Sequence, residues 1–406
     1  MNEHDKGDSL LMKIRRIGRN ITMRRVLIGA SILLIAGMIS GLTVYGLEQA
    51  KPDEQTVVVP TTTPEPSEPS KTPDQTPDEE SSEMPEKPTP SATPTPGPTI
   101  PPGFKVTGYI THWRFNTLSN VDFNMVTHII WQGLEVTSGQ DPTLRVSNDA
   151  DWKQIERLAE LGHAHNIKVL ISLVGHWDNP DLTDIWKSPT LRAELINNIK
   201  KLIENYDIDG IDLDNENYCD PAIYSQFIEE LYKAINPQGT IISLAAHPYK
   251  VCINANAAEC LDFVNLMTYD MGHGPGYPYH STLEESITAL NLWTHAGIPK
   301  NKLLMGIPFY GRDGHITPFE YWWIVNRYDP SPDQNEVDEP LAAGGVVWWN
   351  GIDLVKEKTE YVLDNHFGGV MVYELGNDCF DERSLLLAAF EELTEQYQSL
   401  DMTGSG

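Results

Sequence analysis

The chain has 406 residues, which is enough for one large domain with appendages or for two domains. Its formal net charge is −29 and its pI is about 4.6. This charge argues against binding to nucleic acid, where lysine and arginine must meet phosphates, but it is compatible with a neutral polymer such as a glycan.

The first 47 residues combine a basic segment with an apolar one. Residues 1–25 contain seven lysines and arginines against three acids, and residues 26–47 carry no charge. These 22 residues are long enough to cross a bilayer as a helix, and the basic flank should stay in the cytoplasm. We therefore expect a cytoplasmic tail over 1–25 and a single membrane-spanning helix over 26–47, with the rest of the chain outside the cell. The alternative is a cleaved signal peptide and secretion, for which Val44-Tyr45-Gly46 would be a poor cleavage site.

Residues 48–103 are rich in proline, threonine, serine and glutamate. Such a composition cannot bury a hydrophobic core, so this segment is predicted to be an extended linker. Its threonines and serines could carry O-linked sugars, and the sequence leaves that open.

From Phe104 onward, short apolar runs alternate with longer amphipathic stretches. The runs predict eight strands: Val106–Thr111, Met125–Leu134, Lys168–Gly175, Gly210–Glu216, Thr240–His247, Phe263–Asp270, Lys302–Gly311 and Gly368–Leu375. The amphipathic stretches predict helices over Asp151–Asn166, Leu191–Tyr206, Pro221–Ala234, Leu283–Ala296, Ile352–His366 and Glu382–Gln396. This order favours an α/β fold, a (β/α)8 TIM barrel over residues 104–398, followed by a flexible tail at 399–406. The active site of such a barrel lies at the carboxyl ends of its strands.

One predicted strand end carries four acids in eight residues, Asp209-Gly210-Ile211-Asp212-Leu213-Asp214-Asn215-Glu216. Because side chains alternate on a strand, Asp212, Asp214 and Glu216 should share one face. Repulsion and burial would then raise a carboxyl pKa, which is what a glycosidase needs in order to protonate its leaving group. A solvated acidic turn and a calcium loop are the alternatives. A calcium loop would not carry apolar residues at 211 and 213, or its glycine at the second position.

These residues resemble the signature of glycoside hydrolase family 18, the chitinases and endo-β-N-acetylglucosaminidases. The resemblance rests on Asp209-x-x-Asp212-x-Asp214-x-Glu216 and covers about 104–398. Four further stretches agree with it in order: Lys168–Gly175, Met267–Asp270, Met305–Gly311 and Gly369–Leu375.

The resemblance implies a retaining, substrate-assisted mechanism in which the sugar's acetamido oxygen is the nucleophile. Glu216 would be the general acid and base, and Asp214 would hold the acetamido N–H. Asp212 would hydrogen-bond Asp214, and the Tyr269 hydroxyl would position the acetamido carbonyl. Asp209 and Ser172 would support the structure.

Several other side chains are expected to bind substrate. They are Asp270, Tyr109, Tyr373 as the floor of the site, and the tryptophans Trp113 and Trp177, with Trp131 as a further sugar platform. Tyr373 stands where the family usually has tryptophan. Val174 and Asn215 also depart from the family pattern, which suggests a divergent member with a substrate other than crystalline chitin. The segment 312–367 should form a reduced insertion.

We expect neither a cofactor nor a metal, because no Cys-x-x-Cys or histidine pair supports zinc. Local pairing of Cys252 with Cys260 and pairing of Cys219 with Cys379 are both considered. The expected partners are an N-acetylglucosamine-containing glycan and the membrane, with no nucleic acid, for a monomeric enzyme. A catalytically inactive lectin-like barrel and a glucosaminidase acting on peptidoglycan, spore wall or N-glycans remain open alternatives.

Overall fold

The computed structural model describes residues 99–175, 182–216, 220–272, 279–314, 317–340, 342 and 344–403. The predicted cytoplasmic tail, membrane helix and most of the linker lie outside these residues, as do Trp177 and Cys219. Within the described part of the chain, no helix is both long and apolar enough to span a bilayer.

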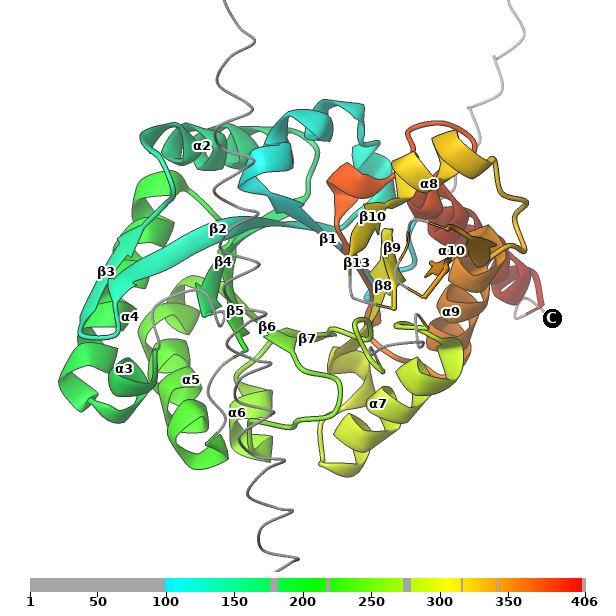
Figure 1. The fold of residues 1–406 in the computed structure, drawn as a ribbon. Coiled ribbons are helices and arrows are strands. Elements are labelled where there is room, and N and C mark those ends of the chain that lie inside the picture. The colour runs from blue at the N-terminus through cyan, green and yellow to red at the C-terminus, as the bar shows by residue number, and fades with distance from the viewer. Residues whose placement is uncertain are drawn as a thin grey trace, which may run out of the picture. The chain divides into compact units, whose positions relative to one another are not determined.

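Eight parallel strands close into a barrel (Figure 1). The ring closes because β1, the first strand, pairs in parallel with β2 on one side and with β13, the last strand, on the other. The eight strands are β1 (Lys105–Thr111), β2 (His128–Ser138), β4 (Lys168–Gly175), β5 (Gly210–Asn215), β6 (Ile241–Ala246), β7 (Phe263–Leu266), β8 (Leu303–Pro308) and β13 (Gly369–Tyr373). The predicted (β/α)8 architecture is confirmed.

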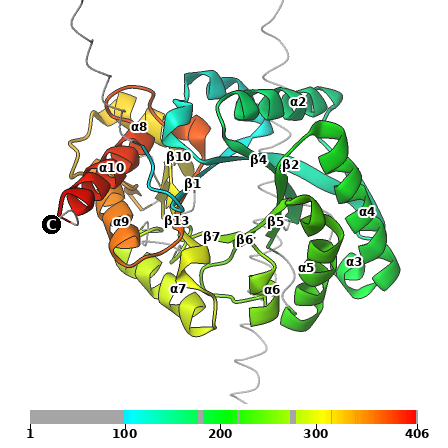
Figure 2. The same cartoon turned by 180° about the vertical axis from the view of Figure 1, so that it is seen from behind.

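Helices surround this ring, as the views from both sides show (Figures 1 and 2). Their starts follow ordinary capping rules: Asn148 and Asp151 form a capping box on α2, and Asp220 caps α5 ahead of Pro221. The α-helices around the barrel are α2 (Asp149–Ala164), α3 (Thr183–Lys187), α4 (Pro189–Tyr206), α5 (Pro221–Ile235), α6 (Ala255–Glu259), α7 (Leu283–His295), α9 (Ile352–Asp364) and α10 (Leu385–Thr403). Short 3-10 turns are η1 (His112–Asn120), η2 (Phe123–Met125), η3 (Asn236–Gln238), η4 (Lys300–Lys302) and η5 (Leu375–Asn377).

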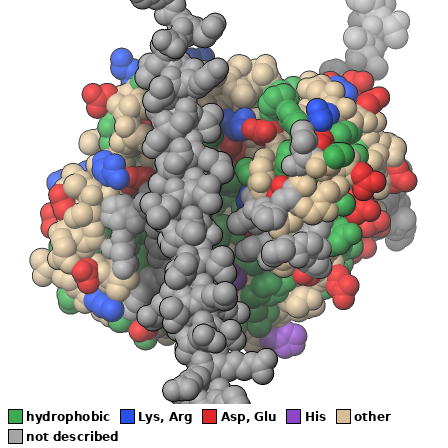
Figure 3. All heavy atoms as spheres, viewed as in Figure 1, with side chains coloured by type: hydrophobic (Ala, Val, Ile, Leu, Met, Phe, Trp, Pro, Cys, Tyr) green, Lys and Arg blue, Asp and Glu red, His purple; other side chains and the backbone are tan. Residues whose placement is uncertain are grey.

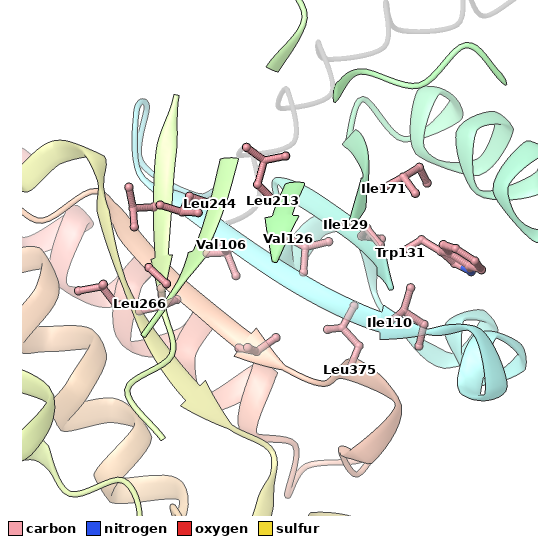
Figure 4. Packing of buried hydrophobic residues seen from close by; sticks show 14 of the residues in the cluster. Val106, Ile110, Val126, Ile129, Trp131, Ile171, Leu213, Leu244, Leu266 and Leu375 are labelled. Atoms are coloured by element: carbon pink, nitrogen blue, oxygen red, sulfur yellow. The ribbon is translucent and has the colours of Figure 1, made fainter. Parts of the chain in front are cut away.

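The strands bury two separate apolar layers. The inner layer contains one residue from each of seven barrel strands: Tyr109, Ile130, Leu170, Ala245, Phe263, Leu304 and Met371. The outer layer lies between strands and helices and includes Ile129, Trp131, Ile171 and Leu213 (Figure 4). Since β5 contributes Ile211 and Leu213 outward, its alternate residues Asp212 and Asp214 face the barrel interior.

Two additions depart from a plain barrel. The strand β3 (Asp141–Arg145) extends β2 as an antiparallel hairpin. A four-stranded antiparallel sheet, β10-β9-β12-β11, follows β8 together with α8 (Tyr321–Tyr328) and forms the reduced insertion that the sequence predicts for 312–367. Its strands are β9 (Tyr310–Asp313), β10 (Pro318–Glu320), β11 (Glu336–Asp338) and β12 (Val346–Trp348).

Both cysteine pairs considered from the sequence are wrong. Cys252 is disulfide-bonded, whereas Cys260 and Cys379 are free thiols. Cys379 is buried against apolar neighbours, and this burial raises the pKa of its thiol to about 12, so it is an unreactive core residue.

Acidic side chains are spread along the right-hand rim of the face in Figure 3, in keeping with the net charge of −29. Such a surface favours a neutral or cationic ligand over a polyanion.

Barrel closure gives a stability prediction at Gly369. This residue has φ +148°, and an added Cβ would lie 1.9 Å from the Lys105 carbonyl oxygen on the neighbouring strand. Gly369→Ala should therefore destabilise the fold by on the order of 3 kcal/mol or more, measured by urea unfolding. Gly239→Ala is the matched control, because Gly239 has φ +74° but open space around it, and should cost only about 1 kcal/mol. Equal losses in the two variants would show that the β1–β13 contact does not limit closure.

Candidate active site

A cavity of about 740 Å³ opens at the carboxyl ends of the barrel strands. Its walls come from most of the barrel strands and from the insertion. The chemically relevant lining residues are Tyr109, Trp113, Arg114, Gln132, Asp214, Glu216, His247, Tyr269, Asp270, Tyr310, Arg312, Glu320, Tyr373 and Glu374.

Asp212 lies beneath this cavity and is fully buried. Its carboxylate accepts hydrogen bonds from three hydroxyls: Tyr109 at 3.0 Å, Ser172 at 2.8 Å and Ser243 at 2.6 Å. Ser172, Asp212 and Ser243 are direct register partners on adjacent strands, so the sheet itself sets this geometry. Burial raises the pKa of Asp212, and the three hydroxyl donors oppose that rise.

Asp214 is two residues further along the same face and is 2% exposed. The expected hydrogen bond between Asp212 and Asp214 is not present among the described contacts. Asp212 accepts from three hydroxyls, and the Gln132 amide donates to Asp214 Oδ2 at 3.0 Å. The other oxygen, Oδ1, is buried and has no hydrogen-bond partner among the residues that the structure describes. Burial and then the charges of Glu216 and Asp212 raise the pKa of Asp214 well above its usual range.

Glu216 immediately follows β5 and is exposed to the cavity. Its backbone N–H donates to the Gly175 carbonyl at 3.0 Å, which continues the β5 pairing with β4 for one more residue. The three acids predicted to share a face therefore do so, and their exposure increases from Asp212 outward.

Aromatic rings form the floor of the cavity. Tyr269 stacks on Tyr373 with ring centroids 5.8 Å apart, and Tyr109 lies 5.7 Å from Tyr373 in a tilted arrangement. Among the described residues, the Tyr269 hydroxyl donates only to the sulfur of Met371, at 3.8 Å. Sulfur is a weak acceptor, so a better acceptor could receive this hydrogen bond instead. Burial raises the pKa of Tyr269 well above its usual value, which keeps the hydroxyl protonated as a donor.

Asp270 is held by a bidentate ion pair with Arg312, with N–O distances of 2.7 and 2.6 Å. Its backbone N–H also donates to His280 Nδ1 at 3.3 Å. Burial opposes ionisation, but the neighbouring His280 and Arg312 prevail and lower the pKa of Asp270, so it is a fixed anion at the cavity wall.

A second charged group also lines the cavity. Arg114 forms ion pairs with Glu320 of the insertion at 2.5 Å and with Glu374, at the end of β13, at 3.1 Å. Glu374 also accepts the Thr111 N–H at 2.8 Å, and burial raises its pKa. This group ties the insertion to the barrel beside the cavity.

The remaining predicted residues divide by position. Tyr109 lines the cavity, and its hydroxyl donates to Asp212, so it supports that buried carboxylate. Asp209 accepts bonds from Lys168 Nζ at 2.6 Å and the Val169 N–H at 2.9 Å at the opposite end of β5, which agrees with its predicted structural role. Trp113 is 65% exposed at the cavity rim.

Trp131 is a correction. It is fully buried in the outer layer and donates its indole N–H to Gln154, so it cannot be a sugar platform. Trp177 lies outside the described residues.

Sequence reasoning missed Gln132, Tyr310, Arg114 and Glu374 among the lining residues. Gln132 alternates with Trp131 on β2, so strand periodicity applied to that run would have placed it inside the barrel. Arg114 and Glu374 are brought together only by the closed ring, and no local pattern marks them.

No group of three or more histidine, cysteine, aspartate or glutamate residues in the described chain is arranged to hold a metal ion.

Comparison with known proteins agrees with this arrangement. The sequence model described as glycosyl hydrolases family 18 matches residues 105–378. The chain belongs to this family. It is 25% identical over 350 residues to probable chitinase 10 of Drosophila melanogaster, covering 68% of this chain but 15% of that protein. It is 24% identical over 344 residues to chitotriosidase-1 of Mus musculus, covering 68% of this chain and 74% of the relative.

Among solved structures, the GH18 chitinase ChiB from Flavobacterium johnsoniae superposes with a TM-score of 0.63 at 26% identity, covering 74% of this chain and 96% of that one. The chain spans 15% and 41% of the lengths of two of the curated relatives that it matches, probable chitinase 10 and an endochitinase of Manduca sexta.

Proposed function

We propose that this family 18 domain hydrolyses β-1,4 bonds in N-acetylglucosamine-containing glycans, chitin or chitooligosaccharides, with Glu216 as general acid and base. The observation that carries this proposal is the pair of Asp214 and Glu216 on one face of β5, in the same cavity as the Tyr269 hydroxyl. Chitinase names among the relatives support the substrate class.

The reaction would proceed with the substrate's own acetamido group as nucleophile. Glu216 would give its proton to the leaving oxygen while the acetamido oxygen attacks the anomeric carbon. Asp214 would accept the acetamido N–H and face the resulting oxazolinium cation, and Tyr269 would donate to the acetamido carbonyl. Glu216 would then take a proton from the water that opens this ring, and the configuration would be retained after two inversions.

The lectin-like alternative is less well supported. A barrel that only bound sugar would not need an acid at the end of β5, yet Glu216 and both supporting aspartates are present and clustered. A screen of the intact chain against chitooligosaccharides, peptidoglycan and N-glycans tests the proposal, and the last two serve as comparison substrates.

The first functional prediction concerns Glu216. Glu216→Gln keeps the shape of the side chain but removes the transferable proton, so kcat should fall by on the order of 10²-fold or more while ligand binding is kept. Asp214→Asn should also slow turnover strongly, because it removes the charge that faces the oxazolinium. The measurement is steady-state hydrolysis of chitooligosaccharides. Glu357→Gln, at an exposed position of α9, is the control and should match wild type. Near-native turnover by the Glu216 variant would move the acid elsewhere.

The second concerns the nucleophile. Oligomers with N-acetylglucosamine in the −1 subsite should be cleaved with retention, whereas matched oligomers with glucosamine there should bind without being cleaved. A thiazoline mimic of the cyclised intermediate should inhibit, because it resembles the species that the site stabilises. Product analysis by NMR decides this. Equal cleavage of both oligomers, or an inverted product, would favour a two-carboxylate mechanism with water as the nucleophile.

The third concerns location. We propose that residues 26–47 anchor the domain in the cell membrane with the barrel outside, on the basis of their 22 uncharged residues and the basic segment before them. Protease added to intact cells should cut within 48–103 and release a folded barrel. Protection of the barrel until the cells are lysed would rule this topology out, and a soluble secreted form lacking 26–47 would indicate signal cleavage.

A further inference from the structure

Three side chains from three strands form a continuous hydrogen-bonded relay beneath the cavity. The Tyr373 hydroxyl, at the end of β13, donates to Gln132 Oε1 on β2 at 2.7 Å. The Gln132 Nε2 in turn donates to Asp214 Oδ2 on β5 at 3.0 Å. Tyr373 and Gln132 are 241 residues apart in the sequence, so only barrel closure brings them together.

The relay fixes the orientation of the Gln132 amide. A tyrosine hydroxyl can donate its one proton to the amide oxygen, and the amide nitrogen then points at the Asp214 carboxyl group, whose ionised form can only accept. Tyr373 is itself held in place, because its ring stacks on Tyr269 and lies against Tyr109. The packing around Tyr373 therefore holds the Gln132 amide in the orientation in which it donates to Asp214.

The consequence falls on the two oxygens of Asp214. Oδ2 accepts from Gln132, whereas Oδ1 is buried and has no hydrogen-bond partner in the described part of the chain. A buried carboxylate oxygen without a donor is costly, so Oδ1 is the position that an incoming N–H would satisfy. Asp212 does not compete for it, since its carboxylate is occupied by the hydroxyls of Tyr109, Ser172 and Ser243.

We propose that Gln132 is a positioning residue that clamps Asp214 Oδ2, with Tyr373 as its second link, and so reserves Oδ1 for the acetamido N–H of the substrate. The catalytic part of this inference rests on the proposed function, whereas the clamp itself does not. Tyr373 thus has two separable roles. Its ring forms part of the floor of the site, and its hydroxyl, through Gln132, orients the Asp214 carboxylate.

Direct titration of Asp214 tests the clamp without any substrate. The titratable groups that interact electrostatically with Asp214 are Asp212 and Glu216, from β5 and its end, together with Tyr109, Tyr224, Tyr269 and Tyr373. The Gln132 N–H stabilises the charged form of Asp214, so it lowers a pKa that burial and the two neighbouring acids raise. Loss of this donor should therefore move the titration to higher pH.

The variants are Gln132→Met, which keeps the length of the side chain, and Tyr373→Phe, which keeps the ring and removes only the hydroxyl. Carboxyl ¹³C NMR of aspartate-labelled protein, with Asp214→Asn to assign the resonance, gives the apparent pKa. Both variants should raise it, Gln132→Met more than Tyr373→Phe. Tyr361→Phe is the control, because Tyr361 packs on Phe367 in the outer part of the barrel and should change nothing. An unchanged Asp214 titration in both folded variants would overturn the clamp.

Kinetics test the catalytic consequence. Both variants should lower kcat on chitooligosaccharides by about tenfold with KM within about twofold, because the loss is in orientation rather than in contact with the sugar. The double variant should lose little more than Gln132→Met alone, because both changes break one relay. If Tyr373→Phe kept the wild-type kcat while Glu216→Gln was inactive, the clamp would have no catalytic role. The proposed function would still stand. If wild type cleaves no acetylated oligomer, the proposed function fails, and the NMR titration alone then decides the clamp.

Discussion

The arrangement of the barrel interior depends on burying the Asp212 carboxylate without a cation. A buried carboxylate costs several kcal/mol unless its oxygens are satisfied. Here the satisfying groups are neutral hydroxyls from strands on both sides: Tyr109 on β1, Ser172 on β4 and Ser243 on β6. A slip of one residue in β4 or β6 would turn its serine to the opposite face and leave the carboxylate short of a donor. One buried acid therefore helps to specify the register of the strands around it.

Because side chains alternate along β5, Asp214 and Glu216 lie on the same face as Asp212 and progressively further from its buried carboxylate. Positions i and i+2 on β5 are about 7 Å apart along the strand. Asp212 is enclosed by hydroxyls, Asp214 has one amide donor, and Glu216 reaches the open cavity. Environment, rather than side-chain chemistry, distinguishes the three acids. The outermost can exchange protons with a ligand and water, while the inner two hold fixed charge or hydrogen bonds beneath it.

Much of this could be predicted from sequence because the decisive signals are local. Gly210–Glu216 alternates acids with aliphatic residues, so one short run gives the strand, the buried face and the acids together. Lys168–Gly175 was predicted to the residue because an apolar run with a clear start and end marks a buried strand.

The error at Trp131 has an equally local cause. By residue type alone, a large aromatic near a strand end suggests a sugar platform. Alternation with Ile130, however, puts Trp131 on the helix side and Gln132 inside the barrel. The short strands of the insertion, three residues each in β10, β11 and β12, show no period, because pairing with β9 and with each other determines them. The cysteine pairs failed because spacing along the chain does not give the distance between loops.

The departure at Tyr373 illustrates what a single position cannot reveal. Considered alone, a tyrosine in place of the family's tryptophan offers a smaller ring for stacking against a sugar. Considered with Gln132, it supplies a hydroxyl that an indole could not replace, because the indole N–H leaves its ring in a different direction and at a different distance. A glutamine at 132 without that hydroxyl would leave its amide oxygen short of a donor and free to turn away from Asp214. The two residues therefore make physical sense as a pair, and the smaller ring comes with a hydroxyl that orients the Gln132 amide toward Asp214.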